Sequence, residues 1–391
     1  MKATEVPLDA QAILGKLVAF NTVSSVSNLE LIEWVEQFLH RHDIPTERVP
    51  NEDGSKASLL ARIGPDVAGG VVLSGHTDVV PVEGQPWQTE PFTLSERDGR
   101  LYGRGSCDMK GFLACALATV PHWQQLDLQR PIWLALSYDE EIGCLGAPDM
   151  IEQLMAHHPR PDSVIIGEPT LMAPVTQQKG ITSLRTTVHG VEAHSSQIPQ
   201  GISAIHAAAR LIERIENIMG ELEAEKRLNN AFNVPYSSLH VGRVQGGTAI
   251  NIMARQCRFD WEIRHLPEDG FDEVFERFTA ASNALEQELT ARNPHFALET
   301  ERLTPTVPAL ADRNNERVLA LCDTLLGARE REAVAFATEG GQFQNAGLQV
   351  VICGPGSIAQ AHQPDEYIES DQLKQCAIFM HRLGEQLTEL N

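Results

Sequence analysis

The sequence has no paired cysteines at metal-binding spacing, no long apolar run and few basic residues. Its seven cysteines are an odd number and none forms a C-x-x-C pair, which argues against a disulfide framework and a thiolate zinc site. Lys and Arg number 31 against 53 Asp and Glu, giving a formal net charge of −22. We therefore expect neither nucleic acid nor an anionic membrane as the main partner.

The hydropathy of the chain predicts a protein without targeting or membrane segments. Residues 1–20 lack a continuous apolar core and a small-residue cleavage site, so no secretory signal is expected. No stretch reaches the roughly 18 apolar residues that a spanning helix needs. Because the hydrophobic fraction is 42%, a sizeable core is still expected. These features favour a cytoplasmic protein with buried, reduced thiols.

The two ends of the chain alternate expected helices and strands. Helices are expected at residues 10–18, 28–41, 110–120, 315–326 and from 371 onward, and buried strands at residues 71–73, 131–137, 163–166 and 348–353. Strands separated by helices are typical of a parallel sheet. We therefore expect an α/β domain with a mixed, largely parallel sheet.

A middle segment of about 120 residues has a different order of elements. Strands are expected at residues 181–189, 236–244, 257–264 and 296–301, and helices at residues 201–219 and 271–289. This β-α-β-β-α-β order is the ferredoxin-like one. We predict a domain formed by residues 1–179 and 304–391, interrupted by an inserted α+β domain at residues 180–303.

Polar residues follow several of the expected strands. His76 and Asp78 come just after the strand at 71–73 and project to the same side of an extended chain. This pair suits a metal-binding imidazole with a supporting carboxylate, and a structural histidine is the alternative. Asp108 precedes an expected helix, where a carboxylate either caps the helix or bridges two metal ions.

Further carboxylates and a second histidine complete the candidate set. Asp139, Glu140 and Glu141 follow a buried strand, and their repulsion requires cations or protons nearby unless they form a solvated loop. Adjacent residues of an extended chain face opposite ways. We therefore expect one of Glu140 and Glu141 to bind metal and the other to accept a proton. Glu168 and His362 also follow expected strands.

One motif points to a different chemistry. Gly354-x-Gly356-x-x-Ala359 follows a strand and matches the dinucleotide-binding fingerprint. The chain after Ala359 is too short for the usual binding half, and Pro355 interrupts the start of a helix. We therefore do not expect dinucleotide binding.

The conjunction of these residues is more informative than any one of them. The set shares one α/β domain and consists of His76, Asp108, Glu141, Glu168 and His362. Two imidazoles and three carboxylates suit two divalent ions that share a bridging carboxylate. Nitrogen and oxygen ligands without thiolate fit two Zn²⁺, with Co²⁺ or Mn²⁺ as substitutes.

Five ordered motifs resemble those of the M20 family of co-catalytic metallohydrolases. They are GHTDVVP, GRGSCDMKG, YDEEIG, IGEPT and GPGSIAQAHQPDEYIE. The resemblance covers nearly the whole chain and is closest to the members that deacetylate N-acetylornithine. It implies an α/β catalytic domain with an inserted lid and dimerisation domain.

The resemblance also implies a role for each residue of the candidate metal site. It places His76 and Glu168 on one metal, and Glu141 and His362 on the other, with Asp108 bridging both. Asp78 would fix the tautomer of the His76 ring through its N–H. Glu140 would be the general base that takes a proton from water and passes it to the leaving amine.

Further residues resemble the family's substrate site. His194 would help to stabilise the oxyanion, in dimeric relatives from the partner subunit, although a capping or surface histidine is the alternative. Asn251 and Arg264 would bind the substrate carboxylate, unless Arg264 forms a structural ion pair with Asp260 or Glu262.

The loop that contributes to substrate choice departs from the family pattern. Glu339 could pair with a cationic substrate amine, and Gly340 followed by another glycine replaces bulkier residues. This departure puts the preference for N-acetylornithine in doubt.

The expected function is hydrolysis of an N-acetyl-L-amino acid, first of all N²-acetyl-L-ornithine in arginine biosynthesis. The expected partners are this small molecule and a second copy of the chain. A succinyl-diaminopimelate desuccinylase, another N-acyl amino acid deacylase or a dipeptidase remains open, as does a metal-free, non-catalytic relative. A serine hydrolase is disfavoured because no G-x-S-x-G motif is present.

Overall fold

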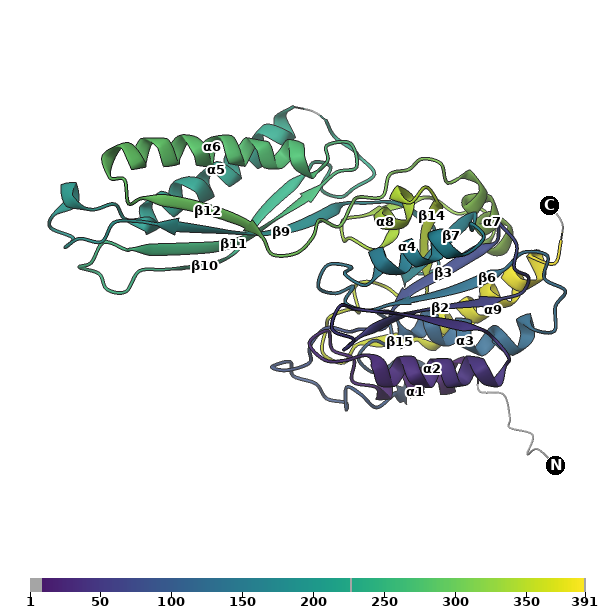
Figure 1. The fold of residues 1–391 in the computed structure, drawn as a ribbon. Coiled ribbons are helices and arrows are strands. Elements are labelled where there is room, and N and C mark those ends of the chain that lie inside the picture. The colour runs from purple at the N-terminus through teal and green to yellow at the C-terminus, as the bar shows by residue number, and fades with distance from the viewer. Residues whose placement is uncertain (1–8, 226, 390–391) are drawn as a thin grey trace. The chain divides into compact units, whose positions relative to one another are not determined.

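An eight-stranded mixed sheet is the framework of the first of two units in the computed structural model, which describes residues 9–225 and 227–389 (Figure 1). Unit 1 comprises residues 1–176, 312–332 and 338–391, and unit 2 comprises residues 177–311 and 333–337. The first eight residues of the segment in which no secretory signal is expected lie outside the described residues.

The strands of this sheet follow the order β1-β2-β6-β3-β7-β14-β8-β13. Their bounds are β1 Thr46–Pro50, β2 Ala57–Ile63, β3 Val71–His76, β6 Ile132–Ser137, β7 Ser163–Pro169, β8 Val175–Gln178, β13 Glu332–Val334 and β14 Gln349–Gly354. β6, β3, β7 and β14 pair in parallel, whereas β1, β2 and β8 pair antiparallel to their neighbours. The expected mixed, largely parallel sheet is confirmed.

The central strands are buried on both faces, which explains their continuous apolar runs. All six residues of β3 and of β6 are buried. Helices α1, α2, α3, α7 and α9 contribute to the core on one face of the sheet, and α4 and α8 pack beside each other away from that core (Figure 1). Their bounds are α1 Ala10–Ala19, α2 Leu29–Arg41, α3 Lys110–Trp123, α4 Ala147–His157, α7 Glu316–Leu326, α8 Gly340–Asn345 and α9 Ser370–Gln386.

A small three-stranded sheet joins segments that are far apart in the sequence. Its order is β15-β5-β4, with β4 Ser95–Arg97, β5 Arg100–Tyr102 and β15 Tyr367–Glu369. The antiparallel pairing of β5 with β15 brings the loop before α3 close to the segment after β14. Both segments carry candidate site residues.

Unit 2 is a four-stranded antiparallel sheet covered by two long helices. The strand order is β10-β11-β9-β12, and the core of the unit lies between the sheet and the helices. The bounds are β9 Gly180–His189, η1 Ile198–Gln200, α5 Ala204–Ala224, β10 Ser238–Gly246, β11 Gln256–His265, α6 Phe271–Arg292 and β12 Ala297–Arg302. This is the predicted ferredoxin-like order.

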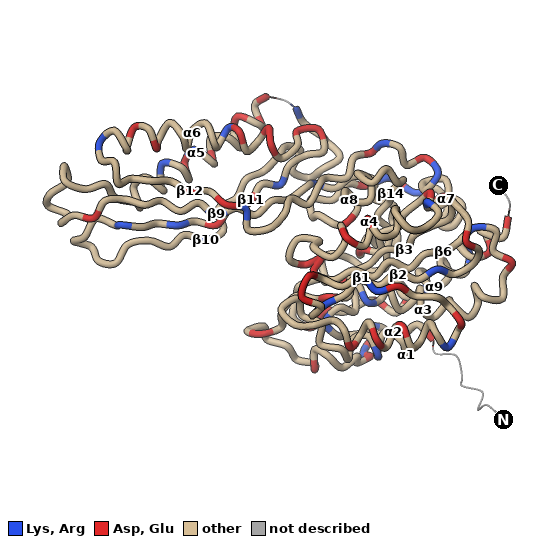
Figure 2. The backbone as a smooth tube through the Cα atoms, in the orientation of Figure 1, with Lys and Arg blue, Asp and Glu red and all other residues tan. Residues whose placement is uncertain are grey.

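Charged residues are mixed in both units. Figure 2 shows Lys and Arg scattered among Asp and Glu rather than gathered in a basic stripe. Among the described residues, no helix combines the length and the apolarity needed to cross a bilayer.

The burial of α9 yields a stability prediction. Leu383 is completely buried in the core, whereas Ile378 on the same helix is 51% exposed. Leu383→Ala should lower the free energy of unfolding by about 2–5 kcal/mol, and Ile378→Ala by less than about 0.5 kcal/mol. Urea unfolding followed by tryptophan fluorescence reports mainly on unit 1, because Trp261 is the only tryptophan outside it. Equal losses for the two variants would contradict the packing described.

Candidate metal centre

The carboxyl ends of the parallel strands meet at one edge of the sheet, and candidate side chains lie there. His76 ends β3, Glu141 follows β6 and Glu168 is next to the last residue of β7. Asp108 precedes α3, and His362 lies in the loop between β14 and β15. Open α/β sheets place their sites at this edge.

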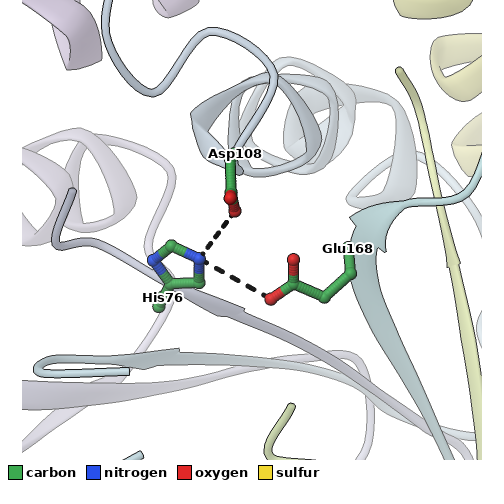
Figure 3. Close-up of side chains that lie close together, drawn as sticks. All are labelled: His76, Asp108 and Glu168. Carbon is green, nitrogen blue, oxygen red and sulfur yellow. Dashed lines mark hydrogen bonds and ion pairs between the residues drawn. The ribbon is translucent and has the colours of Figure 1, made fainter. Parts of the chain in front are cut away.

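His76, Asp108 and Glu168 form the first group of possible metal ligands (Figure 3). The Nε2 atom of His76 lies 3.0 Å from Oδ1 of Asp108 and 3.6 Å from Oε1 of Glu168. All three side chains are buried. We call them the His76 group.

Asp108 also belongs to a second group, with Glu141 and His362. The Nε2 atom of His362 lies 3.0 Å from Oε2 of Glu141 and 3.4 Å from Oδ2 of Asp108. Asp108 thus presents Oδ1 to one histidine and Oδ2 to the other. We call this second set the His362 group, and the arrangement is that of a carboxylate shared between two cation sites.

The His76 ring is held by the backbone rather than by the carboxylate of Asp78. Its Nδ1 atom lies 2.9 Å from the carbonyl oxygen of Asp78 but 3.6 Å from Oδ1 of that residue. A carbonyl only accepts hydrogen bonds, so Nδ1 carries the proton. The lone pair of Nε2 is then free for a metal ion in the neutral ring.

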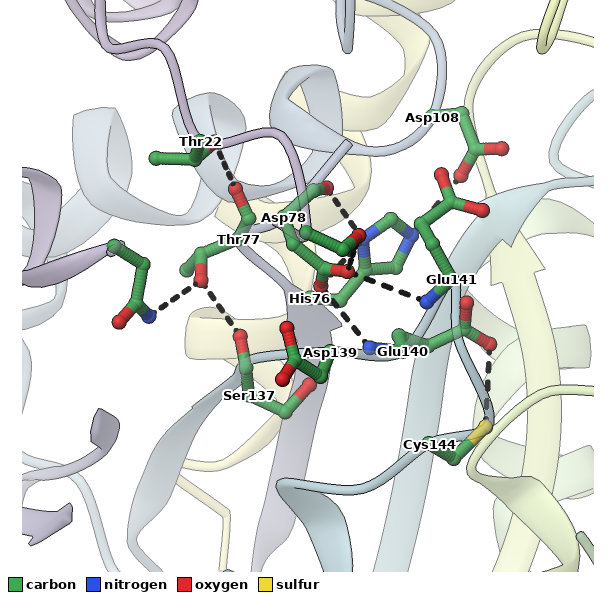
Figure 4. A network of polar contacts seen from close by, with 12 residues as sticks. Thr22, His76, Thr77, Asp78, Asp108, Ser137, Asp139, Glu140, Glu141 and Cys144 are labelled. Carbon is green, nitrogen blue, oxygen red and sulfur yellow. Dashed lines mark hydrogen bonds and ion pairs between the residues drawn. The ribbon is translucent and has the colours of Figure 1, made fainter. Parts of the chain in front are cut away.

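The Asp78 carboxylate instead organises the turn after β6 (Figure 4). Its two oxygens accept the backbone N–H groups of Glu140 and Glu141 at 3.1 and 3.3 Å, and Oδ2 also accepts the Ser24 hydroxyl at 2.7 Å. The ring-tautomer role expected for Asp78 is therefore supplied by its carbonyl, because its carboxylate is engaged by these donors.

Electrostatics within the cluster are dominated by buried negative charge. Burial, together with neighbouring Asp108, raises the pKa of Glu141 to about 7 and that of Glu168 well above its usual value. Hydrogen bonds with Asp108 and Glu141 raise the pKa of His362 to about 10. Burial opposes protonation of His76, but Asp108 and Glu168 still raise its pKa.

Carboxylates this close together and this well buried require compensating positive charge, as protons or as cations. The donors around Asp108 are imidazole nitrogens and carboxylate oxygens, which suit divalent transition ions. The Nδ1–H of His76 already has its acceptor. The residues therefore fit two divalent ions.

Glu140 lies beside both groups and belongs to neither. Burial and the charge of Glu141 raise its pKa well above the usual range. The Cys144 thiol donates to its Oε1 atom over 3.4 Å (Figure 4). A carboxylate with a raised pKa can accept a proton and later release it at neutral pH.

The residues expected to shape the substrate loop are buried. Glu339 is 1% exposed, and its Oε2 atom accepts the Ser74 hydroxyl at 2.8 Å. Burial raises its pKa. Gly340 begins α8 and donates its N–H to the Thr338 hydroxyl. Glu339 thus contacts strand β3 through Ser74, two residues before His76.

The remaining expected residues belong to unit 2. His194 is exposed, and the N–H of Ser196 donates to its Nδ1 atom, so the neutral ring carries its proton on Nε2. Asn251 is also exposed, and its carbonyl accepts the N–H of Ser195. Because Nδ1 of His194 accepts the Ser196 N–H, the Nε2–H group of His194 remains free as a hydrogen-bond donor.

Arg264 forms the structural ion pair that the sequence left open. Its Nε atom lies 2.7 Å from Oε1 of Glu262, and Nη1 donates to the carbonyl of Ala335. Asp260 pairs instead with Arg185. If Arg264 binds a substrate carboxylate, it does so while it is paired with Glu262.

Several buried charges beside the site were not predicted from the sequence. Arg104 pairs with Glu366, and the Lys110 ammonium donates to the carbonyls of Leu17 and Phe20. All three charged residues lie within or beside the recognised motifs. Only the fold reveals which groups they contact.

The dinucleotide fingerprint is not in its required context. The element that follows β14 is strand β15 at Tyr367, so Gly354, Gly356 and Ala359 do not open a helix. The phosphate-binding helix terminus of that motif is therefore missing at this place.

Comparisons with known proteins agree with this geometry. Residues 72–386 match the family described as peptidase family M20/M25/M40. An acetylornithine deacetylase from Myxococcus xanthus is 34% identical over 377 residues, which cover 95% of this chain and 96% of that protein.

Two solved structures have the same fold. A tripeptidase from Staphylococcus aureus aligns with a TM-score of 0.75 and 18% identity, over 98% of this chain and 100% of its own. A dinuclear metal-binding peptidase of the M20 family from Bacillus subtilis aligns with a TM-score of 0.64 and 15% identity, over 96% and 97% of the two chains.

The two ligand groups predict that metal binding stabilises the fold. Adding Zn²⁺ to chelator-stripped protein should raise the thermal midpoint, because an ion at 100 times its dissociation constant adds about 2.7 kcal/mol. Glu168→Ala should reduce the metal content from two ions per chain toward one, measured by atomic emission. An unchanged midpoint with Zn²⁺, or an unchanged metal content in the variant, would contradict this assignment.

Proposed function

The chain belongs to peptidase family M20/M25/M40, and we propose that it hydrolyses the amide bond of an N-acyl-L-amino acid, with N²-acetyl-L-ornithine as the preferred substrate. The observation that carries this proposal is the position of Asp108. Its two oxygens face two different histidines, and the carboxylate of Glu140, which belongs to neither ligand group, lies beside them.

The choice of substrate rests on the curated relative. The Myxococcus xanthus protein named acetylornithine deacetylase matches almost the full length of this chain. The hydrolase character follows from the family, and the acetyl and ornithine preferences are transferred from this relative as part of the proposal.

We assign two divalent ions to the site, Zn²⁺ first and Co²⁺ or Mn²⁺ as substitutes. The His76 group would hold one ion and the His362 group the other, with Asp108 common to both. When bound, the ions supply Lewis acidity toward the amide carbonyl and lower the pKa of water.

Glu140 moves the proton in the proposed reaction. Its Oε2 atom takes a proton from the attacking water while Asp78 holds the backbone of residue 140 in place. The raised pKa lets the acid form persist until the proton passes to the leaving amine nitrogen. The amine then departs as a neutral group rather than as an amide anion.

Unit 2 supplies the proposed substrate contacts. His194 has a free Nε2–H donor that suits a developing oxyanion. We propose that Asn251 and Arg264 recognise the substrate carboxylate and that the unit also mediates homodimer formation.

The seven cysteines are all free and buried, which supports the proposed cytoplasmic location because that compartment keeps thiols reduced.

Glu140→Gln tests the proton-transfer role. The variant should lower kcat by about 10²–10⁴-fold, because the amide cannot accept a proton. Metal content should stay at the wild-type value, since Glu140 belongs to neither ligand group. Glu152→Gln, an exposed position on α4, is the matched control and should leave kcat unchanged. Full activity of Glu140→Gln would refute its assigned role.

A substrate panel tests the reaction itself. Purified protein should release acetate from N²-acetyl-L-ornithine with the highest kcat/KM among N-acetylmethionine, N-succinyl-diaminopimelate and dipeptides. A chelator should abolish turnover and Zn²⁺ should restore it. Preference for the succinyl substrate or a dipeptide would replace the proposed substrate, and chelator-insensitive turnover would remove the metal mechanism.

A further inference from the structure

Glu366 is a buried carboxylate directed at the backbone beside Asp108. It is 1% exposed, and its Oε1 atom accepts the N–H groups of Cys107 and Asp108, both at 3.0 Å. Because one oxygen of Glu366 accepts both amides, it fixes the orientation of the peptide between Cys107 and Asp108, which precedes the shared carboxylate. Glu366 does not belong to either ligand group.

The other oxygen of Glu366 binds an equally buried cation. Nη1 of Arg104 lies 2.7 Å from Oε2 of Glu366, and both side chains are 1% exposed. Nη2 of Arg104 donates to Oε1 of Gln85 at 2.6 Å, and the guanidinium lies 5.0 Å from the ring centre of Trp87. The pair is thus enclosed by further contacts.

The same contacts connect the loop of Asp108 to the loop of His362. The Glu366 carbonyl accepts the N–H of Gly103, which tethers the two segments a second time. Gln85, which binds Arg104, also donates to the carbonyl of His362 at 2.9 Å. The loops of Asp108 and His362 are therefore connected through Glu366 and, separately, through Arg104 and Gln85.

We propose that Glu366 is a positioning residue for the metal centre: its hydrogen bonds to the Cys107 and Asp108 amides, balanced by Arg104, set the separation of Asp108 and His362. This inference rests on the proposed two-ion site. Its consequence is that the hydrogen bonds, rather than the ion pair, determine how tightly the His362 group holds its ion.

Two matched double variants separate the hydrogen bonds from the ion pair. Arg104→Met with Glu366→Gln and Arg104→Met with Glu366→Leu both remove the buried charges. Only the glutamine retains an oxygen that can accept the two amides. A purely structural ion pair would therefore affect the two variants equally.

The readout is Zn²⁺ affinity, measured by chelator competition on metal-free protein. The leucine variant should bind the second Zn²⁺ equivalent about 10–100-fold more weakly than wild type, as for other outer contacts of metal ligands. The glutamine variant should lose less than about tenfold. Circular dichroism of the metal-free proteins verifies that both are folded. If the leucine variant is unfolded, Glu366→Gln alone should still bind both equivalents within about tenfold of wild type.

The exposed pair Arg100 and Glu369 is the control. It joins β5 to β15 at 3.0 Å with both side chains more than 40% exposed. Arg100→Met with Glu369→Gln should leave Zn²⁺ affinity unchanged.

The outcomes distinguish this inference from the proposed function. Equal Zn²⁺ affinities of the leucine and glutamine double variants, or a Glu366→Gln protein that loses more than about tenfold, would overturn the positioning role. Wild-type protein that binds two Zn²⁺ but hydrolyses no N-acyl amino acid would refute the proposed function and leave the inference intact. Wild-type protein that binds no Zn²⁺ would overturn both.

Discussion

Buried negative charge at the carboxyl edge of the main sheet is the constraint on which the rest of this structure depends. The carboxylates of Asp108, Glu141 and Glu168 lie within reach of two imidazoles, and Glu140 lies next to them. Burial and mutual repulsion raise the pKa values of all three glutamates. Such a cluster is stable only when cations or protons compensate it. The fold must therefore supply hydrogen bonds that keep the carboxylates in place while the compensating charge is exchanged.

The surrounding fold supplies those hydrogen bonds largely from the backbone. The Asp78 carboxylate binds the amides of Glu140 and Glu141, and its carbonyl orients the His76 ring. On the other side of the site, Glu366 performs the equivalent task for the amide of Asp108. Both supporting carboxylates thus act on the peptide that carries a functional side chain. These contacts fix the backbone from which each functional side chain projects.

The sequence predicted most of the regular elements that have long apolar patterns, but it missed the apolar strand β2, two helices and the short strands. β3, β6, β7 and β14 lie within a few residues of their expected bounds, because they are continuous apolar runs. Seven strands and two helices were not expected from the sequence: β1, β2, β4, β5, β8, β13 and β15, and α4 and α8. Strands of three residues such as β5 carry no periodicity and exist only through their partners.

The same contrast between local sequence patterns and contacts with distant residues applies to the site. The order of strand followed by polar residue explains why His76, Glu141 and Glu168 lie at one edge, because parallel strands end there, whereas Asp108 reaches the same place from the loop before α3. The contact between Arg104 and Glu366 spans more than 250 residues of sequence, and no local pattern encodes it. Short motifs therefore indicate the candidate ligands, whereas distant partners determine how these side chains are placed. Replacing those partners would therefore move the candidate ligands without removing any of them.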